Sequence, residues 1–280
     1  MNEILIYNAH LIIDGHKEVL NGGLLIKDQH IERVFISPIS IKDYQNIECL
    51  DAGGLMIFPS FISLYNPGNI FGLGRINKTN DLGIYLDSHV YTLSDLKRYD
   101  SYGLIKMIDY DPIMNKDELL LEELIRRKII LNIKTMANAY EEVLTLKKLA
   151  RVVIYNLFED TPSFGLKKPN LSNLAFDDCD CYVNYCFDKF HESIDKLVLN
   201  NIRKPYLIVD TDDYATLFKK LKNYGFSNSE LLMISSLNKV NLLGLDAFYG
   251  TLTRGKFADL VFMNDDYQIV KTMVKGVING

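Results

Sequence analysis

The sequence has few cysteines and no long apolar run, and each absence narrows the class of protein. Four cysteines in 280 residues are too few for a disulfide scaffold. No stretch reaches the roughly 18 uncharged apolar residues that a membrane span requires. The first residues, Met1 to Ile6, include Glu3 and no basic segment, so we expect no signal peptide. We therefore expect a cytoplasmic protein with reduced thiols and no membrane contact.

An excess of positive charge is also absent. Thirty-one Lys and Arg residues stand against 36 Asp and Glu residues, which gives a net charge of -5. This balance provides no basic surface for a nucleic-acid backbone, so we expect no nucleic-acid partner. The hydrophobic fraction of 48% and the charged fraction of 24% are typical of a globular protein that buries a sizeable core.

Short apolar segments bounded by turn residues occur at both ends of the chain. These segments are Ile4–Tyr7, Leu11–Ile13, Gly23–Ile26 and Ile31–Ile36, and later Leu260–Phe262, Ile269–Val270 and Met273–Val274. Segments of this length, separated by Gly, Asp and Asn, predict antiparallel sheet. Because chain termini often lie close together, we expect one small sheet domain built from both ends.

The middle of the chain alternates between two patterns. Leu119–Arg127 and Glu141–Ala150 have helical periodicity. Between and around them lie the short apolar runs 104–108, 129–133, 152–155 and 206–209. Buried parallel strands separated by helices produce this alternation, which predicts an α/β body inserted into the terminal sheet domain.

Two stretches resemble a known family. The first is Asp51–Gly68, and the second combines Asn241–Leu245 with the string G-x-L-x-x-G-K-x-A-D-L-V at Gly250–Val261 and the later pair Lys275-Gly276. Together they resemble the amidohydrolase superfamily, and most closely its N-acetylglucosamine-6-phosphate deacetylases. The resemblance implies a β-sandwich of both termini, here 1–57 and 246–280, beside a metal-bearing (β/α) barrel, here 58–245.

The first barrel strand departs from the pattern of this family. The family reads Pro-Gly-Phe-Ile-Asp-x-His-x-His-Gly, and its histidines face the metal. Here Tyr65 and Pro67 stand at the two histidine positions, and Ser63 replaces the acid. Proline cannot coordinate a metal, and tyrosine is a poor substitute for imidazole. We therefore expect no metal cofactor, or a divalent metal such as zinc only if other residues have become ligands.

The barrel region is also short. Pro59 to Leu245 comprises 187 residues, below the roughly 200 usual for an eight-unit barrel. The shortage falls between Glu159 and Asp210, where the family has further ligand histidines and this chain has only His191. We expect a shortened TIM-barrel-like domain whose open edges need a cover. That need, and the dimers common in this family, favour a homodimer.

Two acidic residues match catalytic positions of the family. Asp210 ends an apolar run, and the resemblance implies that it is the general base and then the general acid. The alternative is a strand-end aspartate that caps the next helix with Asp212 and Asp213. Glu159 matches the metal-binding glutamate if one residue is inserted, and the alternative is a loop acid beside Asp160.

A second metal hypothesis involves cysteine. Cys179, Cys181, Cys186 and His191 carry donors that suit zinc. The segment Cys181–Cys186 also has the pattern of a buried strand, in which free cysteines are core residues. For the remaining histidines we expect surface or core positions; they are His10, His16, His30 and His89.

Three functions remain open. The missing histidines favour a deacetylase homologue without metal-dependent hydrolysis, acting as a binding or regulatory protein for an amino-sugar phosphate. The first alternative is an active deacetylase with rearranged metal ligands and Asp210 as base. The second is a different enzyme that uses a remodelled pocket around Tyr65, Asp109, Asp111 and Asp210.

Overall fold

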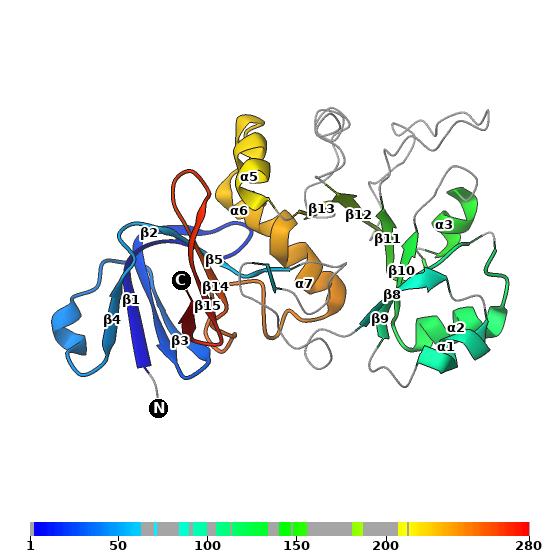
Figure 1. The fold of residues 1–280 in the computed structure, drawn as a ribbon, viewed down its shortest axis with the longest axis horizontal. Coiled ribbons are helices and arrows are strands. Elements are labelled where there is room, and N and C mark those ends of the chain that lie inside the picture. Colours follow the sequence, from blue (N-terminus) through cyan, green and yellow to red (C-terminus); the bar gives the residue numbers. More distant parts are fainter. Residues whose placement is uncertain are drawn as a thin grey trace. The chain divides into compact units, whose positions relative to one another are not determined.

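The structure is a computed structural model of the chain. It describes residues 3–62, 70–71, 84–89, 92–99, 105–112, 114–133, 140–146, 148–155, 181–186, 207–211 and 213–279. The chain forms two compact units (Figure 1). The terminal unit comprises Met1–Ser63, Asn69–Ile76 and Thr211–Gly280, and the central unit comprises Leu64–Gly68 and Asn77–Asp210.

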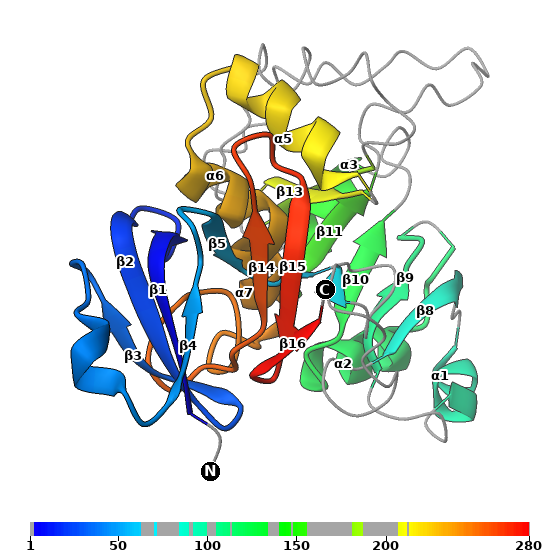
Figure 2. The same ribbon diagram turned by 60° about the vertical axis from the view of Figure 1, so that its left-hand side comes forward.

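An eight-stranded sheet forms the centre of the terminal unit. Its strands are β1 (Glu3–Ile12), β2 (Glu18–Lys27), β3 (His30–Phe35), β4 (Glu48–Asp51), β5 (Met56–Pro59), β14 (Leu260–Met263), β15 (Ile269–Val274) and β16 (Val277–Asn279). The order is β16-β15-β14-β5-β1-β2-β3, and β4 also pairs with β1. Both ends of the chain therefore share one sheet, as Figure 2 shows. The predicted antiparallel pairing holds for β1 with β2 and for β2 with β3, whereas β4 and β5 pair with β1 in parallel.

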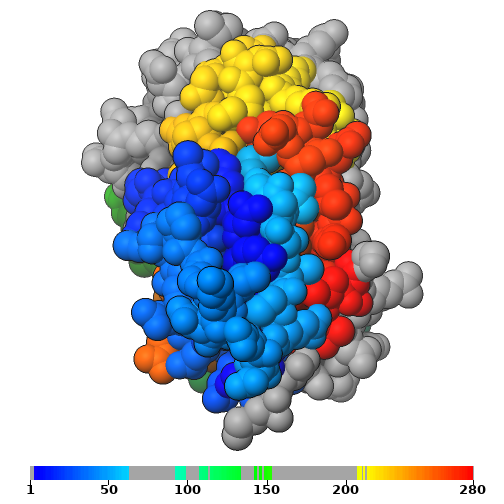
Figure 3. Space-filling view, turned by 90° about the vertical axis from the view of Figure 1, so that its left-hand side faces the viewer, coloured from blue at the N-terminus to red at the C-terminus, as the bar shows by residue number. Residues whose placement is uncertain are grey.

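Segments from the two chain ends pack into one hydrophobic core within this unit. Ile6 and Leu11 of β1 belong to the same buried cluster as Leu260 and Met273 near the C-terminus. On the face drawn in Figure 3, residues in light blue lie between the N-terminal residues in dark blue and the C-terminal residues in red, and in the sheet β5 lies between β1 and β14. The alternation of apolar residues in short strands supplies the buried faces of this sheet.

Two parts of the C-terminal sequence that carry the family resemblance, Ala258-Asp259 and Lys275-Gly276, contact each other through hydrogen bonds. Asp259 is buried and accepts a hydrogen bond from the Lys275 backbone N–H, with 2.5 Å between the atoms. Gly276 donates from its own backbone N–H to the carbonyl of Ala258 at 3.1 Å. Gly276 has φ of +78°, and a Cβ there would lie 2.1 Å from the carbonyl oxygen of Asp28. The Ala-Asp and Lys-Gly pairs therefore serve packing and turn geometry.

One short helix of the terminal unit, η1 (Ile41–Tyr44), precedes the central unit in the sequence. The other helical segments described in this unit follow the central unit; they are α5 (Tyr214–Asn223), α6 (Asn228–Leu232), the π-helical turn η7 (Met233–Leu237) and α7 (Asn238–Leu243). Asp213 caps α5, because its side chain accepts from the backbone N–H of Thr216. Ser227 and Glu230 form a capping box at α6. A two-stranded antiparallel sheet pairs β6 (Phe61–Ile62) with β7 (Ile70–Phe71).

The central unit contains a six-stranded sheet. Its strands are β8 (Ile84–His89), β9 (Ile105–Asp109), β10 (Ile130–Ile133), β11 (Val152–Tyr155), β12 (Cys181–Cys186) and β13 (Leu207–Asp210). All neighbours are parallel and follow the order of the chain. The helices α1 (Leu93–Tyr99), α2 (Glu118–Arg126) and α3 (Tyr140–Leu146) lie between strands in the sequence. This consecutive parallel order is the order of a (β/α) barrel and confirms the predicted alternation.

The fold class is therefore mixed α/β, as the sequence predicts. The shortening of the barrel and the terminal β-sandwich stay predictions, and so do the domain boundaries at residues 57 and 246. None of the helices in the described part of the chain is long and apolar enough to cross a membrane.

Candidate functional site

The carboxyl edge of the central sheet holds a buried polar pair. Asp109 is the last residue of β9, and it stands in register with Asn132 of β10. Both side chains are fully buried, and Asn132 Nδ2 donates to Asp109 Oδ1 at 2.7 Å. His89, the last residue of β8, is the register partner of Asp109 on the other side. Barrel enzymes carry their catalytic groups at this edge, so the neighbouring positions His89, Asp109 and Asn132 mark the first candidate site.

Asp111 has a different role from Asp109, although the sequence places the two in one predicted pocket. The Asp111 carboxylate accepts from the backbone N–H of Met114 at 3.1 Å, and its own N–H donates to Asn115 Oδ1 at 3.0 Å. The neighbouring Tyr110 hydroxyl donates to the carbonyl of Asn115 at 3.3 Å. Burial, and then the charge of Asp111, raise the pKa of Tyr110. These contacts shape the turn after β9.

Asp210 occupies the position that the sequence predicts for it along the backbone. It is the last residue of β13 and is the register partner of Cys186 on β12. The side chain of Asp210 lies outside the part that the structure describes. The helix cap predicted for this region belongs to Asp213, which begins α5. The catalytic role of Asp210 stays a prediction.

The other predicted site residues fall mostly outside the described residues. This holds for Ser63, Tyr65, Pro67, Glu159, Cys179 and His191. The backbone of Cys181–Cys186 forms β12, which confirms the predicted strand. The zinc hypothesis for the cysteines and the metal role of Glu159 both stay predictions.

A second polar cluster lies in the terminal unit, around Lys239 of α7. The Lys239 side chain is fully buried. Its Nζ donates to the backbone carbonyl of Ile62 at 2.5 Å and to the Tyr214 hydroxyl at 3.4 Å. The ring of Tyr214 packs against Phe61, with 4.5 Å between the ring centroids. The ammonium therefore links the end of β6 to the start of α5.

A π-helical turn precedes Lys239 and supplies a second contact to the segment 60–62. Ser236 of this turn is fully buried, and its Oγ donates to the Ser60 carbonyl at 2.6 Å. The carbonyls of Ser60 and Ile62 both accept from side chains of the segment 233–243. Single π-helical turns occur frequently at functional sites, because they change the register of the side chains that follow.

Sequence reasoning missed both Asn132 and Lys239. Asn132 is the single polar residue of the apolar segment 129–133, and Lys239 is the single charged residue of the mainly apolar segment 231–245. Buried polar side chains require hydrogen-bond partners, so an isolated polar residue in such a segment indicates a specific contact. The sequence therefore contained the signal of a buried contact, but it did not show which residue is the partner.

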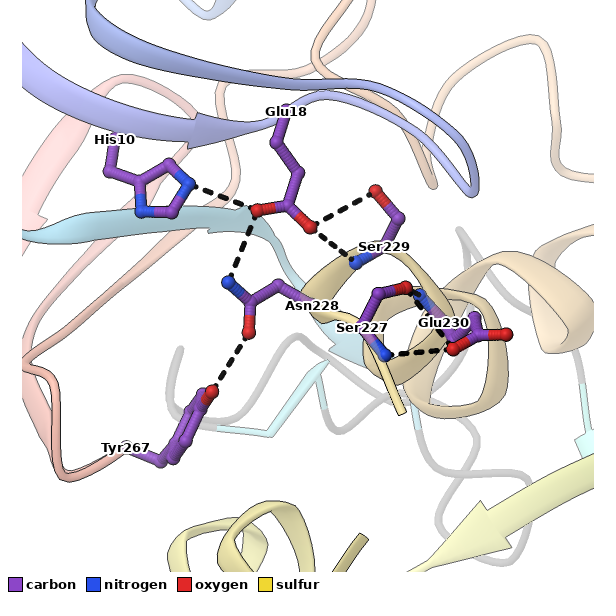
Figure 4. A network of polar contacts seen from close by, with 7 residues as sticks. All are labelled: His10, Glu18, Ser227, Asn228, Ser229, Glu230 and Tyr267. Atoms are coloured by element: carbon purple, nitrogen blue, oxygen red, sulfur yellow. Dashed lines mark hydrogen bonds and ion pairs between the residues drawn. The ribbon is translucent and has the colours of Figure 1, made fainter. Parts of the chain in front are cut away.

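Glu18 of β2 forms a polar network that fastens α6 to the terminal sheet (Figure 4). Its carboxylate accepts from the backbone N–H of Ser229 at 3.1 Å and from Asn228 Nδ2 at 3.2 Å. His10 Nε2 lies 3.0 Å from the same carboxylate, and the Tyr267 hydroxyl donates to Asn228 Oδ1 at 2.8 Å. A carboxylate at a helix N-terminus is favoured by the helix dipole, so this network has a structural role.

Comparisons with known proteins show which family model and which solved folds this chain resembles. The model of the amidohydrolase family matches residues 194–278. N-acetylglucosamine-6-phosphate deacetylase from Pasteurella multocida is similar in structure, with a TM-score of 0.79 and 13% identity over 99% of this chain and 100% of that chain. A variant of the Mycobacterium smegmatis deacetylase, solved in complex with N-acetyl-D-glucosamine-6-phosphate, has a TM-score of 0.73 and 14% identity over 99% of each chain.

The similarity extends to other activities. Dihydropyrimidinase from Brevibacillus agri has a TM-score of 0.62 and 12% identity over 99% of this chain and 94% of that chain. No curated protein matches the chain. The sequence match in the C-terminal part and the fold match over nearly all of the chain lead to one conclusion. The chain resembles the amidohydrolase superfamily, with solved N-acetylglucosamine-6-phosphate deacetylases among its structural neighbours.

Proposed function

We propose that this chain is a deacetylase-like protein that binds an amino-sugar phosphate and does not carry out metal-dependent hydrolysis. The observation that carries the proposal is the pair Tyr65 and Pro67, in a frame set by Pro59, Phe61 and Gly68. A hydrolytic metal site needs three protein ligands and an open position, and these substitutions remove two imidazoles at once. The protein would then act as a binding or regulatory homologue.

The donor set at the first strand does not fit the divalent metal that amidohydrolases usually use. A proline offers no ligand atom at position 67. Ser63 replaces the acid of the family pattern, and tyrosine at position 65 is a poor substitute for imidazole. We therefore derive no reaction step through a metal ion.

Support for the ligand class comes from the structural neighbours. One solved neighbour of the same fold binds N-acetyl-D-glucosamine-6-phosphate. The described carboxyl edge of the central sheet carries Asp109 and Asn132, and β13 ends there with Asp210. Carboxylate and amide groups provide the acceptors and donors that sugar hydroxyls require. Asp210 is the position that we propose for a retained contact to the ligand.

A thermal-shift experiment tests binding. Addition of N-acetylglucosamine-6-phosphate is expected to raise the Tm, because a ligand at about 100 times its Kd adds about 2.7 kcal/mol to the unfolding free energy. Glucose 6-phosphate and unphosphorylated N-acetylglucosamine are the control ligands. The Asp210→Asn variant is expected to lose most of the shift. An unchanged Tm with all three sugars would count against the binding function.

An acetate-release assay separates the proposal from the active deacetylase. The protein is purified without chelator or nickel, its metal content is measured, and zinc is then added in excess. We expect acetate to be released no faster than in a control that contains buffer, substrate and zinc but no protein. Metal-dependent acetate release that disappears in Asp210→Asn would establish the alternative, a deacetylase with rearranged ligands in which Asp210 is the base.

A different enzyme activity is the remaining alternative, and the buried pair at the carboxyl edge favours it. Asp109 is in hydrogen-bond contact with Asn132, an arrangement that can orient a carboxylate for proton transfer. The sequence-based pocket of Tyr65, Asp109, Asp111 and Asp210 belongs to this alternative. Turnover of a sugar phosphate without acetate release, lost in Asp109→Asn, would support it.

We also propose a homodimer, because a shortened barrel leaves strand edges that a second copy can cover. Sedimentation velocity at micromolar concentration checks this. A dimer that persists on dilution is the expected result, and a monodisperse monomer would contradict the proposal.

A further inference from the structure

The chain leaves the terminal unit after Ser63 and enters it for the last time at Thr211. The described residues close to these two positions form an outgoing segment, 60–62, and a returning segment, the helix α5 (Tyr214–Asn223). Both segments belong to the terminal unit. The proposed function makes no use of the way in which they are held.

One side chain contacts both segments. Lys239 of α7 is fully buried, and its Nζ donates to the carbonyl of Ile62 at 2.5 Å and to the hydroxyl of Tyr214 at 3.4 Å. The two segments also contact each other directly, because the Tyr214 ring packs against Phe61 with 4.5 Å between the ring centroids. A buried polar group that loses a partner keeps its desolvation penalty, so the opening of either segment is costly at Lys239.

Two serines of the π-helical turn before Lys239 make contacts of a different kind. Ser236 is fully buried, and its Oγ donates to the Ser60 carbonyl at 2.6 Å. Ser235 is also fully buried, but its Oγ donates within the helical segment, to the carbonyl of Leu231 at 2.7 Å. Ser236 therefore fastens the outgoing segment to the helix, whereas Lys239 fastens both the outgoing and the returning segment.

We propose that Lys239 is a clamp that makes the outgoing and the returning segment of the terminal unit open and close together. Local opening free energies differ between the parts of a protein, and parts that share buried contacts open as one cooperative unit. When Ile62 separates from the ammonium, a contact that fixes Nζ beside Tyr214 is lost as well, and the reverse also holds. The clamp acts within the terminal unit and does not depend on a ligand.

Hydrogen exchange of the full chain, followed by mass spectrometry, tests the inference. Peptides that cover 56–62 and 214–223 report on the two segments. In Lys239→Met, which keeps a long side chain without a hydrogen-bond donor, we expect exchange in both peptides to become about tenfold to hundredfold faster. In Ser236→Ala we expect faster exchange in the first peptide and unchanged exchange in the second.

A matched lysine of the same unit provides the control. Lys256 also donates to a backbone carbonyl, that of Tyr249 at 2.9 Å, so Lys256→Met removes a comparable contact elsewhere and should leave both peptides unchanged. A peptide that covers β2 (Glu18–Lys27) is the internal reference for global unfolding. In Lys239→Met its exchange should accelerate less than that of the two segments.

Three results would overturn the inference. Exchange in Lys239→Met could accelerate in one peptide alone, in neither, or by the same factor in β2 as in both segments, which would indicate a global loss of stability. If Lys239→Met does not fold, both peptides of the unmodified protein are followed at increasing urea concentration. We then expect one opening free energy for both segments, below that of β2, and two different values would overturn the clamp.

Discussion

Asn132 of β10 donates a hydrogen bond to Asp109 of β9, with 2.7 Å between Nδ2 and Oδ1. Both side chains are fully buried, and the two residues are register partners of neighbouring parallel strands. The pair joins two strands at the edge where the fold places catalytic groups. It therefore connects the stability of the central unit to the geometry of its candidate site.

Replacement of Asn132 by alanine removes one donor from the buried Asp109 carboxyl group. The expected loss is about 2 kcal/mol of unfolding free energy, because a buried polar group that loses a partner keeps its desolvation penalty. Urea unfolding followed by circular dichroism measures it. Glu122→Ala, on the exposed face of α2, is the control and should change stability by less than about 0.5 kcal/mol. Equal effects of the two substitutions would contradict the role of the pair.

Substitutions at two glycines of the C-terminal motif distinguish the cost of a left-handed backbone conformation from the cost of a steric clash. Gly255 and Gly276 have φ of +88° and +78°, and a Cβ at Gly255 has no atom within 4 Å. Gly255→Ala should therefore lower the unfolding free energy by only about 1 kcal/mol, because alanine disfavours the left-handed conformation. Gly276→Ala adds a clash with the Asp28 carbonyl, at 2.1 Å from the new Cβ, and should cost about 3 kcal/mol or more. Thermal unfolding of both variants checks this order, and a smaller cost at Gly276 would refute it.

The Glu18 network should contribute more to stability than an exposed ion pair of the same sheet. Glu18→Ala removes the acceptor for Ser229 and Asn228 at the start of α6, and about 2 kcal/mol is the expected cost. Glu3→Ala breaks an exposed pair with Lys27 and should cost no more than about 0.5 kcal/mol. Chemical denaturation at neutral pH gives both values. Similar losses would mean that Glu18 does not fasten the helix.

Stability is expected to fall at alkaline pH because of Tyr267. Burial, and then the negative charges of Glu18 and Asp265, raise the pKa of Tyr267 to about 12 from its ordinary value of 10.0. The folded state therefore holds its phenol proton more tightly than the unfolded state. The contribution of Tyr267 to the unfolding free energy is therefore complete below pH 10 and is lost as the pH rises toward 12.

The Tyr267→Phe variant isolates this contribution. Below pH 10 it should be less stable than the unmodified protein, because the hydrogen bond to Asn228 is absent. Between pH 10 and pH 12 the difference between the two proteins should shrink. Urea unfolding at several alkaline pH values measures the difference, and a constant gap across this range would show that Tyr267 does not titrate as described.

Much of the fold could be predicted from local pattern. The strands at both ends of the chain, the parallel strands of the middle and the helix at α2 all occur where apolar periodicity places them. The predicted strands Ile4–Tyr7 and Leu11–Ile13 are joined into β1, because the register shifts around Ala9 and Asn8 has φ of +55°. An irregularity of this kind leaves no trace in the hydrophobic pattern.

The candidate site was less predictable. Asp109 and Asp111 lie two positions apart, yet one is fully buried against Asn132 and the other accepts a backbone N–H in a turn. Their residue type is the same, so the difference comes from the strand end between them. Lys239 was overlooked because its partner Ile62 lies 177 positions away, and a local pattern does not reveal so distant a contact.

The amino-acid sequence by itself determined which side chains stand at the two positions where the family pattern has histidines. Tyr65 and Pro67 lack imidazole whatever the fold, and the net charge of -5 follows from composition alone. Only the tertiary structure decided that the Lys239 ammonium lies at the end of β6 and that Asn132 meets Asp109. Periodicity reports how a segment relates to its nearest neighbours, whereas these contacts arise when the packing of distant segments buries polar groups that must find partners.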